Sequence, residues 1–181
     1  MRFKSTFTVL SLSIAMLFSL NSNAQKFSDL DKSPMDVAAF PSDYKDANKL
    51  IKITYSRPQL KGRAFATLAP TGKVWRAGAN EAAELTLYVP MMLGDTKVPA
   101  GTYTFYVIPG EKEWTAIVNK DLNVWGSYFY KEDEDIARLS VPVTEADKSL
   151  EAFSIAFEEA KDGVHMHLGW GKKRAAVPFT K

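Results

Sequence analysis

Apolar and polar residues alternate along most of the chain after residue 50. In the segment 51–56 (IKITYS), Ile51, Ile53 and Tyr55 share one side of an extended backbone and polar side chains occupy the other. The same period of two recurs at 85–89, 103–107, 114–118, 153–157 and 164–170. This alternation is typical of strands with one buried and one solvated face. The pattern therefore predicts an all-β protein.

Turn residues stand between these segments. Pro109-Gly110 suits a type II turn that joins 102–108 to 113–119 in a hairpin, and Asp162-Gly163 joins the last two alternating segments in the same way. Short strands with Pro and Gly between them favour a single β-sandwich, jelly-roll or Ig-like, with mostly antiparallel strands. Helical signals are weak, and we expect one turn each at 131–137 and 144–149.

Three regions follow from the pattern. Residues 1–24 read as a signal peptide, and residues 25–49 are polar, contain two prolines and are expected to form an extended lead-in. Residues 50–181 are expected to form the β-sandwich domain, with a long irregular loop between residues 55 and 81. About 157 residues remain after the signal, which is enough for one hydrophobic core.

The signal reading depends on the order of three parts. A basic start precedes an apolar run at 9–20, and small residues follow at 22–24, which predicts cleavage between Ala24 and Gln25. The apolar run is too short to span a bilayer, which takes roughly 20 residues. With no cysteine to carry a lipid at the cleavage site, we expect a free periplasmic or secreted protein without a membrane span.

The net charge bears on the kind of partner that the protein binds, and the cysteine content bears on how the domain is stabilised. The chain has 23 Lys and Arg against 21 Asp and Glu, and the signal holds two of the basic residues, Arg2 and Lys4. The expected mature chain is therefore formally neutral, and no nucleic-acid partner is predicted. The chain has no cysteine, so the domain must be held by its core and not by disulfides.

The common catalytic motifs are absent from the sequence. There is no cysteine nucleophile, Gly-x-Ser-x-Gly elbow, phosphate-binding glycine loop or His-Glu-x-x-His, and no cofactor is indicated. His165 and His167 would share one strand face and are weak metal candidates. No third ligand is signalled near them, so we favour two polar residues on the wet side of a strand and predict no metal.

The long loop concentrates residues suited to a polar ligand. Arginine beside an indole offers a forked donor next to a flat apolar surface, and Asn and Glu add directional hydrogen bonds. This mixture suits sugar hydroxyls, a carboxylate or a peptide backbone. An ordered loop whose buried carbonyls are satisfied by these side chains remains an equal alternative. The candidate ligand-binding residues are Arg57, Arg63, Trp75, Arg76, Asn80, Glu81 and, from a later segment, Trp125.

The later segment, residues 125–130 (WGSYFY), has four aromatic residues in six. One buried strand face cannot hold them all. They could form an aromatic platform for a ring-shaped ligand, but core packing with a hydrophobic edge is the favoured interpretation, because aromatic residues usually pack.

Several of these motifs, in order, resemble one family. They are Tyr55-Ser56-Arg57-Pro58, Lys61-Gly62-Arg63, the run 72–81 (GKVWRAGANE), Pro99-Ala100-Gly101-Thr102-Tyr103, Ile108-Pro109-Gly110, Trp114 and Trp125-Gly126. Together they resemble a secreted bacterial family of domains of unknown function, family 2911, over residues 33–157. The resemblance implies a β-rich exported domain and implies no activity.

Three hypotheses about function remain. The first is an exported binding module for a carbohydrate or small polar ligand. The second is a hydrolase or lyase acting on an envelope polymer, with Glu81 as acid or base and an arginine stabilising negative charge. A single marked carboxylate is weak support, because glycoside hydrolysis usually needs a pair. The third is a structural or partner-binding domain that uses an exposed sheet edge.

Overall fold

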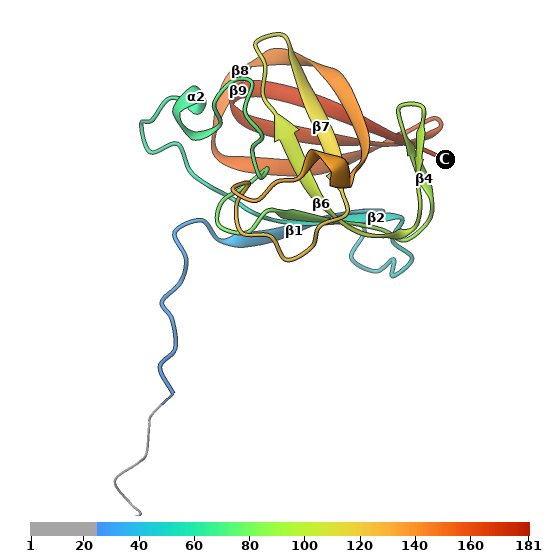
Figure 1. Cartoon of the computed structure of the whole chain (residues 1–181), viewed down its shortest axis with the longest axis horizontal. Coiled ribbons are helices and arrows are strands. Elements are labelled where there is room, and N and C mark those ends of the chain that lie inside the picture. The colour runs from blue at the N-terminus through green and yellow to red at the C-terminus, as the bar shows by residue number, and fades with distance from the viewer. Residues whose placement is uncertain (1–24) are drawn as a thin grey trace, which may run out of the picture. The chain divides into compact units, whose positions relative to one another are not determined.

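Strands dominate the computed structural model, which describes residues 25–181 (Figure 1). The predicted signal peptide, residues 1–24, lies outside the described residues. Residues 25–30 have no regular secondary structure, and the unit from Asp31 to Lys181 holds all the strands. No helix in residues 25–181 is long and apolar enough to cross a membrane.

The described residues contain nine strands and two short helices. The strands are β1 (Met35–Phe40), β2 (Ile51–Ser56), β3 (Ala83–Leu87), β4 (Met91–Leu93), β5 (Thr96–Val98), β6 (Gly101–Ile108), β7 (Glu113–Asn119), β8 (Asp135–Ala160) and β9 (Gly163–Thr180). The helices are α2 (Phe65–Leu68) and the 3-10 turn η1 (Glu132–Glu134). β1 lies within the segment expected to be a lead-in and pairs along its length with β2.

The strands form one antiparallel sheet in the order β1-β2-β3-β6-β7-β8-β9-β4-β5, and the sheet is not closed. The all-β, antiparallel prediction is confirmed. Both predicted hairpins are present, as β6–β7 and β8–β9. The type II turn expected at Pro109-Gly110 is wrong, because Gly110 does not adopt the positive φ that this turn requires. η1 supplies the helical turn expected within 131–137.

The helical turn expected at 144–149 is wrong, because β8 continues through it. Thr144 and Glu145 pair with Arg174 and Lys173 of β9, and the register then shifts before Leu150. β9 supplies backbone hydrogen-bond partners to this part of β8, and a helix here would lose them. The residues of β8 between Glu145 and Leu150 that have no partner in β9 form a bulge.

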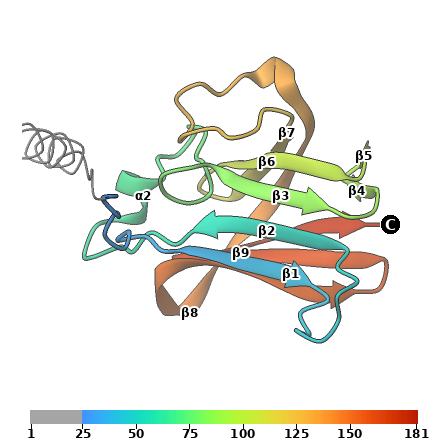
Figure 2. The ribbon, with the colours of Figure 1, turned by 90° about the horizontal axis from the view of Figure 1, so that it is seen from below.

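The sheet bends so that strands distant in its order face each other. β8 curves along its length (Figures 1 and 2). Although three strands separate β2 from β8 in the sheet, the Ile155 backbone N–H donates to the Tyr55 hydroxyl at 2.8 Å. The Tyr55 and Phe153 rings also meet edge to face, with centroids 5.5 Å apart. The two facing surfaces enclose the core between them.

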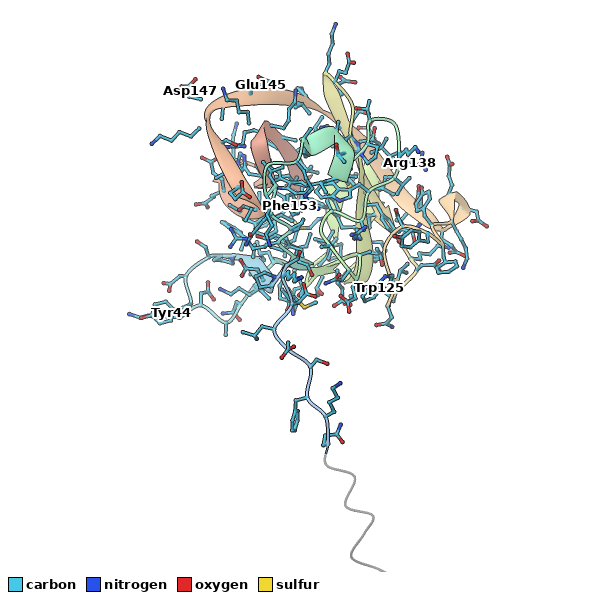
Figure 3. All side chains as sticks on the ribbon, turned by 90° about the vertical axis from the view of Figure 1, so that its left-hand side faces the viewer. Tyr44, Trp125, Arg138, Glu145, Asp147 and Phe153 are labelled. Atoms are coloured by element: carbon cyan, nitrogen blue, oxygen red, sulfur yellow. The ribbon has the colours of Figure 1, made fainter. Side chains whose placement is uncertain are left out.

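Five large aromatic rings fill the centre of this core. Trp75 stacks on Trp170 with centroids 5.5 Å apart, and Phe65 stacks on Trp114 at 5.4 Å. Phe153 contacts the edge of Trp75 at 4.9 Å and lies among the interior side chains in Figure 3. The buried positions of the strands are those that the alternation marked, including Ile51, Leu85, Phe105 and Leu168. The long loop thus contributes Phe65 and Trp75 to the core and is not wholly a surface feature.

Candidate functional site

Two segments far apart in sequence lie side by side and form one surface. We call residues 74–83 the motif loop and residues 124–130 the aromatic loop. A β-bridge pairs Glu81 with Trp125. Three hydrogen bonds of 2.9 Å also join the loops: Ala82 N–H to the Val124 carbonyl, Gly126 N–H to the Asn80 carbonyl and the Ser127 hydroxyl to the Val74 carbonyl. These contacts fix one loop against the other.

The aromatic loop carries three exposed rings. Trp125 is 56% exposed, Tyr128 77% and Phe129 73%, and Figure 3 shows Trp125 away from the interior position of Phe153. We call these three side chains the aromatic patch. Core packing with a hydrophobic edge is the interpretation that the sequence favours, and its core part is wrong for the patch, because these three rings are exposed on a loop and not on a strand. Only Tyr130 packs inward, edge to face on Tyr106 at 5.2 Å.

The backbone beneath the patch is tightly defined. Gly126 has φ +69°, and a Cβ there would lie 2.7 Å from the Tyr128 ring. The position therefore favours glycine on two grounds, the left-handed backbone and the ring packed over it.

A partly buried polar cluster anchors the far end of the aromatic loop. The Tyr130 hydroxyl donates to Asp135, which also accepts from Arg138 and from the Asn119 amide. Burial and, next, the hydrogen bond to Asp135 raise the pKa of Tyr130 above its usual range. The patch thus stands on an ordered base, which lowers the entropic cost of binding a ligand there.

Arg76 lies in the motif loop beside the patch. Its side chain is half-buried, and its buried Nε has no hydrogen-bond partner in the described residues. Burial lowers the pKa of Arg76, and a smaller effect of the nearby Tyr128 opposes this. The guanidinium nevertheless keeps its charge near neutral pH. Arg76 is therefore a charged donor that has no acceptor among residues 25–181.

Next to the two loops is a hollow of about 250 Å³ that is lined by two glutamates. Glu81 of the motif loop and Glu84 of β3 both line it, together with Thr54 and Thr104. Asn80, just before Glu81, adopts a left-handed backbone with φ 60°, a conformation that asparagine tolerates better than most residues. This turn directs the chain from the motif loop into β3.

Three of the predicted ligand-binding residues have roles in the scaffold. Arg57 donates to the Phe153 carbonyl at 3.0 Å, to Asp36 at 2.9 Å and to Ser154 at 2.8 Å, and so joins β1 and β2 to β8. Arg63 donates to two backbone carbonyls just before it. Trp75 is 4% exposed, and its indole N–H donates to the Gly78 carbonyl.

The predicted set therefore divides. The structure places Arg76, Asn80, Glu81 and Trp125 on two adjoining loops and uses the other three in the scaffold. Sequence reasoning left Tyr128, Phe129 and Glu84 out of the site. For the two aromatics a signal was present, because a run too rich in rings for one strand face must expose some of them.

The two histidines lie on β9, and one of them contacts a carboxylate of β8. The His165 and His167 ring centroids are 6.2 Å apart, and His167 Nε2 lies 2.9 Å from a Glu158 carboxylate oxygen. Among residues 25–181, no group of three His, Cys, Asp or Glu side chains is arranged to hold a metal ion.

Comparison with known proteins gives one match. The model of the family described as "Protein of unknown function (DUF2911)" matches residues 33–179. The chain belongs to this family. No curated protein and no solved structure matches it. The DUF2911 match runs from just before β1 to the last but one residue of β9, so the bent sheet and both loops are parts of the family's domain.

Proposed function

We propose that this DUF2911 protein is a binding module for a carbohydrate, with the aromatic patch as the stacking surface. The observation that carries the proposal is the group of three exposed rings held beside Arg76, Asn80 and Glu81 by hydrogen bonds between the two loops. Exposed apolar patches of this kind mark interaction sites more often than chance.

The chemistry of the surface matches that of a sugar. A pyranose has apolar C–H faces, which stack on aromatic rings, and a rim of hydroxyls, which need directed donors and acceptors. Trp and Tyr offer large flat surfaces with few rotatable bonds, so little entropy is lost on binding. The guanidinium of Arg76 and the carboxylate of Glu81 supply a donor and an acceptor beside the rings.

Isothermal titration calorimetry with soluble envelope and plant oligosaccharides tests the proposal. We expect Trp125→Ala to abolish binding, because it removes the largest ring of the patch. Tyr44→Ala is the matched control, since Tyr44 is 88% exposed and lies away from Trp125 (Figure 3). Equal affinities of the wild type and Trp125→Ala for every bound glycan would refute the proposal.

The hollow supports a second candidate, a glycoside hydrolase. The sequence marked only Glu81, and the structure adds Glu84 to the same hollow. Two carboxylates are what glycosidic cleavage usually requires, one as acid and one as base or nucleophile. Appearance of new reducing ends from a bound glycan, lost in both Glu81→Gln and Glu84→Gln, would favour the enzyme over the binder.

We also propose that the protein acts outside the cytoplasm, in the periplasm or as a secreted protein. The order of basic, apolar and small residues in the first 24 positions supports this. Mass spectrometry of the native protein is expected to find a chain beginning at Gln25. A cytoplasmic protein beginning at Met1 would contradict the proposal.

For the type of fold, we propose a β-sandwich whose two layers come from one bent sheet. The contacts of Tyr55 on β2 with Phe153 and Ile155 on β8 support two facing layers. An experimental structure in which the edge strands β1 and β5 pair with each other would show a closed barrel instead.

A further inference from the structure

The side chain of Arg76 differs from the other arginines that the structure describes. Arg57, Arg63, Arg138 and Arg174 each donate at least two side-chain hydrogen bonds to protein acceptors. Arg76 donates none within residues 25–181, and its Nε is shielded from solvent. An acceptor from outside cannot reach this shielded Nε, but it can reach the two terminal Nη groups of the half-buried side chain, which also donate no hydrogen bond within residues 25–181.

No carboxylate of the described residues neutralises this charge. Arg76 takes part in none of the ion pairs that they form. Besides burial, the ionisable group that affects the pKa of Arg76 within residues 25–181 is Tyr128, a member of the aromatic patch. Glu81, although five residues further on, lines the neighbouring hollow, and Arg76 does not.

We propose that the ligand of the aromatic patch is an acidic glycan, whose oxyanion pairs with the Arg76 guanidinium while a sugar ring stacks on the patch. The inference rests on the proposed function and names its ligand class. A guanidinium presents parallel N–H donors that match the two oxygens of a carboxylate or sulfate, and such charge-assisted pairs are stronger than neutral hydrogen bonds.

The surrounding charges also orient such a ligand. Glu81 and Glu84 make the hollow unfavourable for an anion, whereas their oxygens accept hydrogen bonds from hydroxyls. The acidic group therefore lies at the Arg76 and Tyr128 side, and neutral hydroxyls lie toward the glutamates.

Three oligosaccharides of equal length test the inference by calorimetry: a uronate-bearing glycan, its carboxyl-reduced counterpart, and a sulfated form of the latter. We expect the wild type to bind at least one anionic form about tenfold or more tightly than the reduced form. The better anionic form identifies the oxyanion as carboxylate or sulfate. Arg76→Gln should remove the preference, and Arg63→Gln, the same change at an exposed arginine outside the patch, should keep it.

The outcomes separate this inference from the proposed function. If acidic and reduced glycans bind the wild type equally and both require Trp125, the acidic-ligand inference is overturned and the carbohydrate proposal stands. If no glycan binds, both fail. Should Arg76→Gln not fold, Arg76→Lys retains the charge without the fork and is expected to weaken the preference only in part. Two results with Arg76→Lys would each overturn the inference. One is a preference for the anionic glycan equal to that of the wild type. The other is a higher affinity for the reduced glycan than the wild type has.

Discussion

Replacing Trp75 or Trp125 with alanine tests which of the two tryptophans stabilises the fold and which belongs to the exposed surface. Trp75 is 4% exposed and contacts four other aromatic rings, whereas Trp125 is 56% exposed. A buried tryptophan removes about 150–250 Å² from water. At about 25 cal/mol per Å² this amounts to about 4–6 kcal/mol, close to the about 3–5 kcal/mol typical of Trp→Ala in a core.

We therefore expect Trp75→Ala to lower the free energy of unfolding by about 3–5 kcal/mol. Trp125→Ala should lower it by less than about 1 kcal/mol, because the side chain is already mostly solvated. For a domain of this size, about 2–4 °C of Tm accompanies each kcal/mol, so the Trp75 variant should melt about 6–20 °C lower.

Urea unfolding followed by far-UV circular dichroism measures both values without depending on tryptophan fluorescence. The m-value should be unchanged if the variants unfold from the same native state. Equal losses in the two variants, or a loss below about 1 kcal/mol for Trp75→Ala, would refute the division of the predicted residues into scaffold and surface.

Three further variants test other parts of the structure. Arg57→Ala should lower the unfolding free energy by about 1–2 kcal/mol in urea unfolding, because three hydrogen bonds at a partly exposed site are lost. Burial, followed by the charges of Asp121 and Asp135, raises the pKa of Tyr106 to about 12, so stability should fall as the pH rises from about 10 to about 12, where only the unfolded state loses the proton. Tyr106→Phe should reduce that fall and keep full stability near neutral pH, since its hydroxyl has no partner in residues 25–181. Gly126→Ala should weaken glycan binding, because its Cβ would displace the Tyr128 ring.

Each of these has a control or a contradicting result. Gly72→Ala places an alanine at a similar positive φ, +74°, with no atom within 4 Å of the new Cβ, so binding should be retained. An equal loss of binding in both glycine variants would show that backbone strain and not the ring is responsible. Arg57→Lys should not rescue Arg57→Ala, since an ammonium cannot reach three acceptors in a fork. A Tyr106→Phe variant with the same alkaline unfolding as wild type would assign that unfolding to other groups.

The strands and hairpins could be predicted because their signals are local. Alternation in 51–56 and the Pro109-Gly110 turn each depend on a few neighbouring residues, and β2 and the β6–β7 hairpin follow them. The turn expected at 144–149 failed because a polar segment without alternation can still be a strand when a partner such as β9 holds it. Local pattern does not report such a partner.

The site was predicted only in part for a related reason. Nothing near Arg57 in the sequence shows that its guanidinium meets Ser154, 97 positions away. The sequence of the aromatic loop was ambiguous, because a segment rich in aromatic residues is expected both where the rings pack in the core and where they are exposed to bind a ligand. The bridge between Glu81 and Trp125, with the hydrogen bonds on either side of it, places these rings beside the motif loop.

Trp75 and Arg76 show how one motif can both stabilise the core and present a side chain for ligand binding. A bridge to Val107 holds the backbone at Trp75 in extended form, and successive side chains of an extended backbone point to opposite sides. Burying Trp75 in the core thereby turns Arg76 toward the surface. Loss of binding in a Trp75 variant would consequently not demonstrate ligand contact, because the anchor that presents Arg76 would be gone. Contact can be inferred only from Arg76 and Trp125, whose replacement leaves the aromatic core intact.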